Sequence, residues 1–224
     1  MKRSILIVLA LLLAVVAGAG VGRVNETAKS GLGTHHEARS QIIGAHLRQL
    51  SGDYILLMGD SHAESWFAPT GCNLPVVNAG LAGATAETYS RFFASLTLPR
   101  PPRAIILTIG TNDAQYRRIS DPDHAVVTYE RTVETLLKRA AEQTKNVIVT
   151  PVPPLDPGRA AEFSRETALR FSIVLENSCR KQGYRFVDPF SQGAELFDGV
   201  HLVDYGKSYG SIWSEICPYI HQTR

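Results

Sequence analysis

Four short polar segments of this 224-residue chain combine residue types that can do chemistry. They are Gly59-Asp60-Ser61-His62, Asn78-Ala79-Gly80, Gly110-Thr111-Asn112-Asp113 and Asp198-Gly199-Val200-His201. A serine hydroxyl is a poor nucleophile until a base takes its proton, and the imidazole of a histidine is suited to that task near neutral pH. The segments therefore point first to nucleophilic catalysis by a serine.

The first segment is open to two interpretations. The apolar run Tyr54 to Met58 is too short for a helix and is bounded by turn residues, so it predicts a buried strand that delivers Ser61 to its C-terminal end. In open α/β sheets that end is where ligands bind. Ser61-His62-Ala63-Glu64 also fits a helix capping box, in which the hydroxyl only satisfies a backbone N–H.

The rest of the chain alternates short apolar runs with amphipathic segments, which predicts strands alternating with helices. Five strands are expected, near 54–59, 76–78, 104–109, 146–150 and 184–187. Helices are expected after Thr34, over 86–98, from Pro122, over about 158–182 and after Asp204, with Pro218 ending or kinking the last one. This alternation indicates an α/β fold, a three-layer α/β/α sandwich with a five-stranded parallel sheet.

The four polar segments, in this order and at consecutive strand ends, resemble those of the SGNH hydrolases, also called the GDSL esterase/lipase family. The resemblance extends from about Asp53 to Ile216 and implies the flavodoxin-like SGNH hydrolase fold. It implies that Ser61 is the nucleophile and that His201 is the base that later protonates the leaving group. Asp198, three residues earlier, would hold one ring nitrogen of that histidine and stabilise the imidazolium as it forms.

The same resemblance implies an oxyanion hole for the developing negative charge. Its donors would be the backbone N–H of Ser61, the backbone N–H of Gly80 and the side-chain amide of Asn112. His62 would line the pocket. Neither a cofactor nor a metal ion is implied.

Each of these assignments has an alternative. Asn112 and Asp198, taken separately, are also compatible with ordinary turn residues. Asp188, at the end of the fifth expected strand, is the alternative acid. Because Ala63 follows His62, the chain lacks the Gly-x-Ser-x-Gly elbow, which counts against an α/β-hydrolase of the other architecture.

The resemblance implies a serine esterase, and the N-terminal segment described below predicts that it is exported. The modest loops, without a long apolar insertion, favour small acyl groups, acetyl among them, on a carbohydrate or other small-molecule ester. The family motif is Gly-Asp-Ser-Leu, and His62 replaces the leucine here. Within the resemblance, this replacement favours carbohydrate substrates over lipids. Alternatives are an O-acyltransferase, in which a sugar hydroxyl replaces water, and a lysophospholipase or thioesterase-like lipid hydrolase. More remote are a metallophosphoesterase, because Asp60 and His62 could begin a two-metal site, and an anchored binding protein that has lost catalysis.

The N-terminus has the pattern of a targeting segment. Lys2 and Arg3 are followed by residues 4–22, which carry no charge. Residues 1–22 therefore predict either a cleaved signal peptide or an N-terminal membrane anchor, 23–33 a tether and 34–224 the hydrolase domain. In either case we expect the domain to be exported: periplasmic or secreted, or attached to a membrane through 4–22 and facing outward.

Charge and cysteine content narrow the remaining possibilities. Without Lys2 and Arg3 the 23 basic residues become 21, which equals the number of acidic residues, and no basic run is present. This gives nucleic-acid binding little support. Three cysteines allow one disulfide and one buried thiol, and we expect Cys179 to pair with Cys217 because both lie late in the chain on predicted helices.

Overall fold

A computed structural model describes residues 33–222 of the chain. The expected signal peptide or anchor over 1–22 and nearly all of the tether lie outside these residues. No helix in the described range combines the length and apolar character needed to cross a membrane. The chain divides into two compact units, Met1–Arg39 and Ser40–Arg224. In the first unit the structure describes residues 33–39, which are helical, and the second unit holds the sheet.

The central sheet has six strands in the order β2-β3-β1-β4-β5-β6. The strands are β1 (Ile55–Gly59), β2 (Thr70–Gly71), β3 (Leu74–Gly80), β4 (Ala104–Thr108), β5 (Val147–Val149) and β6 (Arg185–Phe186). The five expected strands are present and parallel, but the prediction of a five-stranded sheet missed β2, which pairs antiparallel with β3. Cys72 and Asn73 form the two-residue turn between them with φ of 52° and 59°. Positive φ at both positions matches the twist of a short hairpin.

Strand β1 lies at the centre of the sheet and shows why the molecule has two cores. Ile55 is level with Val76 of β3 and Ala104 of β4. Successive side chains of a strand point to opposite faces. Accordingly Ile55 and Leu57 are buried on one face, and Leu56 and Met58 are buried on the other.

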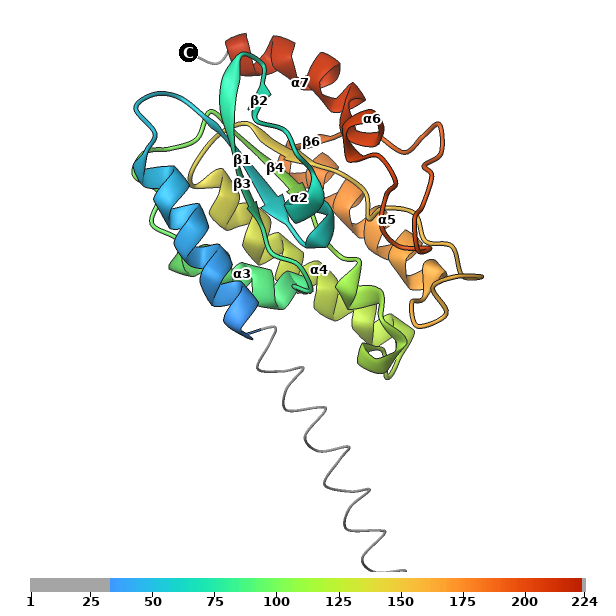
Figure 1. The fold of residues 1–224 in the computed structure, drawn as a ribbon. Coiled ribbons are helices and arrows are strands. Elements are labelled where there is room, and N and C mark those ends of the chain that lie inside the picture. The colour runs from blue at the N-terminus through green and yellow to red at the C-terminus, as the bar shows by residue number, and fades with distance from the viewer. Residues whose placement is uncertain (1–32, 223–224) are drawn as a thin grey trace, which may run out of the picture. The chain divides into compact units, whose positions relative to one another are not determined.

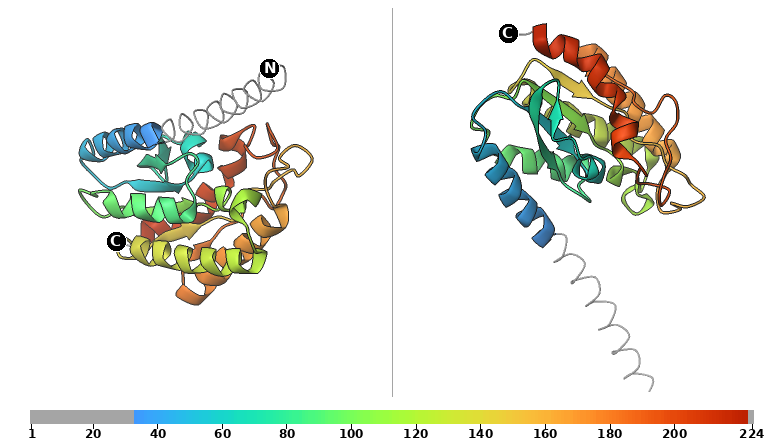
Figure 2. Two further views of the ribbon diagram at one scale, coloured as in Figure 1. Left: turned by 90° about the horizontal axis from the view of Figure 1, so that it is seen from below. Right: turned by 45° about the horizontal axis from the view of Figure 1, so that its top comes forward.

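Helices cover both faces, which confirms the three-layer α/β/α prediction (Figure 1). On one face pack α3 (Ala86–Ser95), α4 (Pro122–Ala141) and α5 (Arg165–Gln182), together with Ile43 and Leu47 from a helical segment over 40–48. On the other face pack α2 (Ser61–Ser65), α6 (Tyr205–Tyr209) and α7 (Ser211–Gln222). The left view of Figure 2 looks onto α3 and α4.

One expected helix start was wrong, and the last helix does not end at Pro218. Helix α5 begins at Arg165 rather than near 158, because Phe163 forms a β-bridge with Gln115 and the side chain of Ser164 caps the helix. Helix α7 continues through Pro218 to Gln222. The lost backbone hydrogen bond is offset there by the apolar residues that α7 buries against the sheet.

The expected disulfide was also wrong. Cys72 pairs with Cys217, and Cys179 is a buried free thiol. Cys179 lies in the core on the α5 side of the sheet, whereas Cys217 packs against the core on the α7 side. Because the sheet separates these two cysteines, Cys217 bonds to the β2–β3 turn instead.

Candidate active site

Ser61 is presented by the sharp turn at the end of β1. Gly59 has φ of +145°, and a Cβ built there would lie 1.8 Å from the carbonyl oxygen of Thr108, so only glycine fits. The buried carboxylate of Asp60 caps α2 by accepting the N–H of His62 at 3.0 Å. It also accepts the N–H of Thr111 at 3.3 Å. The helix cap is therefore Asp60 and not Ser61, which overturns the capping-box interpretation and leaves the serine hydroxyl available.

The structure brings Ser61, His201 and Asp198 into one hydrogen-bonded chain. Ser61 Oγ lies 3.1 Å from His201 Nε2. His201 Nδ1 lies 2.8 Å from Asp198 Oδ2. The other oxygen, Asp198 Oδ1, accepts the backbone N–H groups of Val200 at 2.9 Å and His201 at 2.7 Å. The carboxylate is thus fixed by its own turn and orients the imidazole toward the serine.

The charge of Asp198 suits this position. Burial acts to raise its pKa, but hydrogen bonds from the backbone and ring of His201 and from the N–H of Val200 outweigh it and lower the pKa well below the usual range. An ionised carboxylate favours a proton on Nδ1, which leaves a lone pair on Nε2 to accept the serine proton. The alternative acid, Asp188, accepts the N–H of Phe190 at 2.8 Å within its own loop.

The three expected oxyanion donors differ in how they are engaged. The N–H of Ser61 has no acceptor within the described part of the chain. The N–H of Gly80 donates to Asn78 Oδ1 at 2.9 Å. One N–H of the buried Asn112 amide donates to the carbonyl oxygen of Ala84 at 3.1 Å, which leaves its second N–H for another acceptor.

Asn78 ties the Gly80 segment to α2. Its Nδ2 lies 2.7, 3.2 and 3.0 Å from the carbonyl oxygens of Ala63, Glu64 and Trp66. The two segments are so close that a Cβ at Gly80 would lie 2.1 Å from the backbone nitrogen of Glu64. The sequence singled out Asn78 only as part of a motif; its role as a tie between segments became visible in the structure.

Asp113 anchors the segment that carries Asn112. Its carboxylate accepts the N–H of Ala86 at 2.9 and 3.2 Å, which caps α3 from a different part of the chain. Burial raises the pKa of Asp113 to about 7, with the charge of Asp60 adding to the rise and the Ala86 hydrogen bond opposing it. Burial likewise raises the pKa of Asp60 to about 6 against the hydrogen bonds that its carboxylate accepts.

His62 lies beneath the ring of His201 instead of lining an open pocket, which corrects that expectation. It is fully buried, and neither ring nitrogen has a hydrogen-bond partner among the described residues. The two imidazoles stack with their centroids 5.5 Å apart. Burial, with the charge of His201 in addition, lowers the pKa of His62 to about 3. Neither Asp60 nor His62 belongs to a metal-binding cluster of three or more candidate ligands in the described chain.

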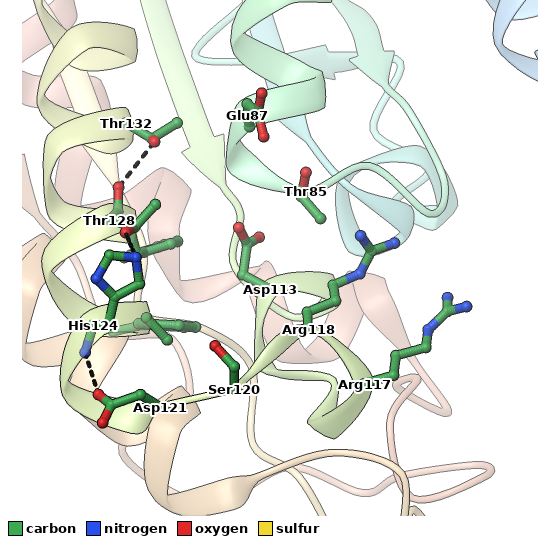
Figure 3. A pocket seen from close by; sticks show the side chains of 13 residues that line it. Thr85, Glu87, Asp113, Arg117, Arg118, Ser120, Asp121, His124, Thr128 and Thr132 are labelled. Atoms are coloured by element: carbon green, nitrogen blue, oxygen red, sulfur yellow. Dashed lines mark hydrogen bonds between the residues drawn. The ribbon is translucent and has the colours of Figure 1, made fainter.

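A cavity of about 810 Å³ adjoins the Asn112 segment without including Ser61 or His201 in its lining (Figure 3). Arg117 and Arg118 come from η2 (Tyr116–Arg118), which follows the η1 segment Asn112–Ala114. Their Nε atoms donate to Gln115 Oε1 at 2.8 and 3.3 Å. Gln115 Nε2 in turn lies 3.5 Å from Asn112 Oδ1. Gln115 therefore links the Asn112 amide to both arginines.

Residues 52–208 match the model of the GDSL-like Lipase/Acylhydrolase family. The match includes all four polar segments and most of the sheet and helices. The chain belongs to this family. It is accordingly a hydrolase that acts on ester bonds, and its fold is that of the SGNH hydrolases. No curated protein sequence matches the chain.

Solved structures of GDSL hydrolases share the fold. The lipase/acylhydrolase from Enterococcus faecalis has a TM-score of 0.62 at 21% identity over 75% of this chain and 97% of its own. A GDSL-like lipase from Bacteroides thetaiotaomicron has a TM-score of 0.63 at 16% identity, covering 83% and 98%. A carbohydrate acetylesterase from Sinorhizobium meliloti has a TM-score of 0.58 at 18% identity, covering 75% and 100%. These identities are low, so the likeness concerns the fold.

Proposed function

We propose that this GDSL hydrolase is an exported serine esterase that removes small acyl groups, acetyl among them, from carbohydrate esters. The observation that carries the proposal is the hydrogen-bonded chain from Ser61 through His201 to Asp198. A serine within hydrogen-bond reach of an imidazole that is itself oriented by a carboxylate is the arrangement that nucleophilic acyl transfer needs.

In the first half-reaction Ser61 Oγ attacks the ester carbonyl carbon while its proton passes to His201 Nε2. The charge that develops on the carbonyl oxygen would be held by the N–H of Ser61, the second N–H of the Asn112 amide and the N–H of Gly80, which shares its proton with Asn78. His201 then gives its proton to the alcohol oxygen as the ester C–O bond breaks. Water attacks the acyl group on Ser61 by the same steps and regenerates the hydroxyl.

Two observations support the finer parts of the proposal. The disulfide between Cys72 and Cys217 is typical of proteins in an oxidising compartment. The uncharged segment 4–22, which follows Lys2 and Arg3, has the pattern of a signal that directs a chain there. The carbohydrate acetylesterase from Sinorhizobium meliloti has the same fold, which makes an acetylated sugar a reasonable first substrate to try.

The test is hydrolysis of a short-chain and a long-chain nitrophenyl ester by the purified protein and by Ser61→Ala, His201→Ala and Asn112→Ala. We expect the short ester to be turned over faster, and each substitution to lower kcat/KM by at least about 10². Ser95→Ala and His46→Ala remove the same side chains from exposed positions on other elements and should leave the rate unchanged. Full activity of Ser61→Ala would refute the proposed nucleophile.

A further inference from the structure

The turn that carries the proposed acid and base lies in the loop between β6 and α6. Hydrogen bonds within this loop give the turn its shape. Leu196 forms an antiparallel bridge with Leu202. The N–H of Phe197 donates to the carbonyl oxygen of His201 at 2.7 Å. Bonds within a loop do not determine where the loop lies, so contacts with other segments must help to keep His201 within reach of Ser61.

One arginine from another segment holds the start of this turn. Arg159 Nη1 donates to the carbonyl oxygens of Leu196 at 3.0 Å and Phe197 at 3.3 Å. Asp198 follows directly in the chain. The Nε atom of the same guanidinium donates to Asp156 Oδ2 at 2.8 Å. Because a guanidinium is planar and rigid, donation from two of its nitrogens fixes its orientation, and its charge strengthens each bond.

The backbone beside Arg159 contacts the middle of the turn. The N–H of Asp156 donates to the carbonyl oxygen of Gly199 at 2.8 Å. Gly199 has φ of +92°, and a Cβ built there would lie 2.8 Å from the Cβ of Arg159. The two segments are therefore in direct contact on both sides of Asp198.

The segment that contains Arg159, residues 156–164, also contacts the other half of the candidate site. Gln115 forms an antiparallel bridge with Phe163, and backbone hydrogen bonds of 2.9 and 2.8 Å join the residues on either side. Gln115 lies three positions after Asn112, the proposed side-chain donor to the oxyanion. Segment 156–164 is thus bonded to the acid–base turn at its start and to the Asn112 segment at its end.

The proposed reaction is sensitive to this connection. His201 must accept a proton from Ser61 and later donate it to the alcohol oxygen, and both transfers need hydrogen-bond distances. A misplacement of about 1 Å can lower a rate by about 10². A side chain that restrains the turn therefore affects the proton transfers without contacting the reacting atoms.

We propose that Arg159 is a positioning residue, which holds the carbonyl groups before Asp198 and so keeps His201 in register with Ser61. This inference rests on the proposed serine esterase function. It adds to that function a residue outside the four polar segments. The sequence predicted a helix from about 158, whereas Arg159 lies in the loop before α5.

The experiment replaces the guanidinium while keeping an unbranched side chain. In Arg159→Met we expect kcat for a short-chain nitrophenyl ester to fall by about tenfold to 10², because both hydrogen bonds to the turn are lost. KM should stay within about twofold, because the substitution affects proton transfer rather than binding. Arg159→Lys keeps one charged donor group and should recover part of kcat.

A second measurement reports on the turn directly. The proton between His201 Nδ1 and Asp198 Oδ2 should give a low-field proton NMR signal, identified by its loss in His201→Ala. In Arg159→Met we expect this signal to shift or disappear, because Asp198 is no longer held. Urea denaturation measures stability separately. A purely structural role would lower the urea midpoint and leave both kcat and the NMR signal of the folded protein unchanged.

Arg100→Met is the matched control, because Arg100 is also exposed and donates from Nη1 to a backbone carbonyl, that of Ser51, at 3.0 Å. It should change neither kcat nor the NMR signal. An unchanged kcat or an unchanged signal in Arg159→Met refutes the positioning role, while activity of the parent protein keeps the esterase proposal. If the parent protein hydrolyses no ester, the esterase proposal is refuted, and the NMR signal alone decides whether Arg159 holds the turn.

Discussion

His62 holds two unpartnered ring nitrogens in a fully buried position beneath His201. A buried polar group without a hydrogen bond costs on the order of 1 to 3 kcal/mol. We predict that His62→Leu increases the free energy of unfolding by about 1 kcal/mol, because an apolar side chain of similar size removes that cost. Urea denaturation measures the change, and a decrease would contradict the prediction.

The same substitution should have the opposite effect on catalysis. The flat neutral ring of His62 faces the imidazole of His201, which becomes positively charged in the proposed mechanism, and an aromatic face stabilises a cation. We expect kcat of His62→Leu to fall several-fold, by up to about tenfold. His62→Phe, which retains an aromatic ring, should keep more of kcat than the leucine variant, and equal losses in the two would show that the ring has no such role.

At the scale of elements, the Asp113 carboxyl group joins the Asn112 segment to the N-terminus of α3 by accepting the N–H of Ala86. Burial raises the pKa of this carboxyl group from 3.8 to about 7. Between about pH 4 and pH 7 the folded protein holds a proton that the unfolded chain has released. The contribution of Asp113 to stability therefore decreases as the pH rises through this window. It is least favourable above about pH 7.

We predict that Asp113→Asn reduces the loss of stability between about pH 5 and pH 8, because the amide oxygen can still accept the N–H of Ala86 without carrying a charge. Urea midpoints at the two pH values measure it, and the variant should be the more stable protein at about pH 8 by roughly 1 to 3 kcal/mol. Asp121→Asn, at the exposed cap of α4, is the control and should shift both midpoints alike. An unchanged pH dependence in Asp113→Asn would contradict the prediction.

The elements that sequence predicts well are those with a local signal. The apolar run before Gly59 correctly predicted β1. Helix α4 was predicted from its start at Asp121-Pro122 and from the helical spacing of its buried residues Tyr129, Val133 and Leu136. The start of α5 could not be predicted, because it depends on a bridge between Phe163 and Gln115, which are distant in the chain.

For the candidate site, too, local motifs could be predicted and contacts between distant segments could not. Ser61, Asp198 and His201 were named from the polar segments, and the structure brings them together. The supporting contacts of Asn78 and Asp113, which lie in the same segments, were missed. Asn78 bonds to carbonyls 12 to 15 positions earlier, and Asp113 caps a helix 27 positions earlier. Contacts of that range leave no periodic pattern in the sequence.

At the scale of the whole molecule, the Cys72–Cys217 disulfide joins the β2–β3 turn to α7 across 145 positions of sequence. Closing so long a loop restricts the unfolded chain strongly, and loss of such a bond typically costs about 2 to 5 kcal/mol. We predict this loss of stability for the double variant Cys72→Ser, Cys217→Ser. Its kcat should change little, because the bond does not involve the turn that holds Asp198 and His201.

Urea denaturation with and without a reducing agent provides the comparison. The reduced parent protein should match the double variant, and the double variant should not respond to the reducing agent. A parent protein whose urea midpoint is unaffected by reduction would contradict the prediction. The buried Cys179 is present in all samples and so cancels from the comparison.

The wide separation between Ser61 and His201, 140 positions, has a consequence for how the protein is made. A nascent chain that has left the ribosome only as far as α5 carries Ser61 but neither the proposed acid nor the proposed base. Asp198 and His201 then arrive together, since one short turn holds both. If these three residues are the proposed triad, hydrolytic capability appears in a single late step of biosynthesis, and a premature stop codon anywhere before that turn yields an inert product rather than a partly competent one.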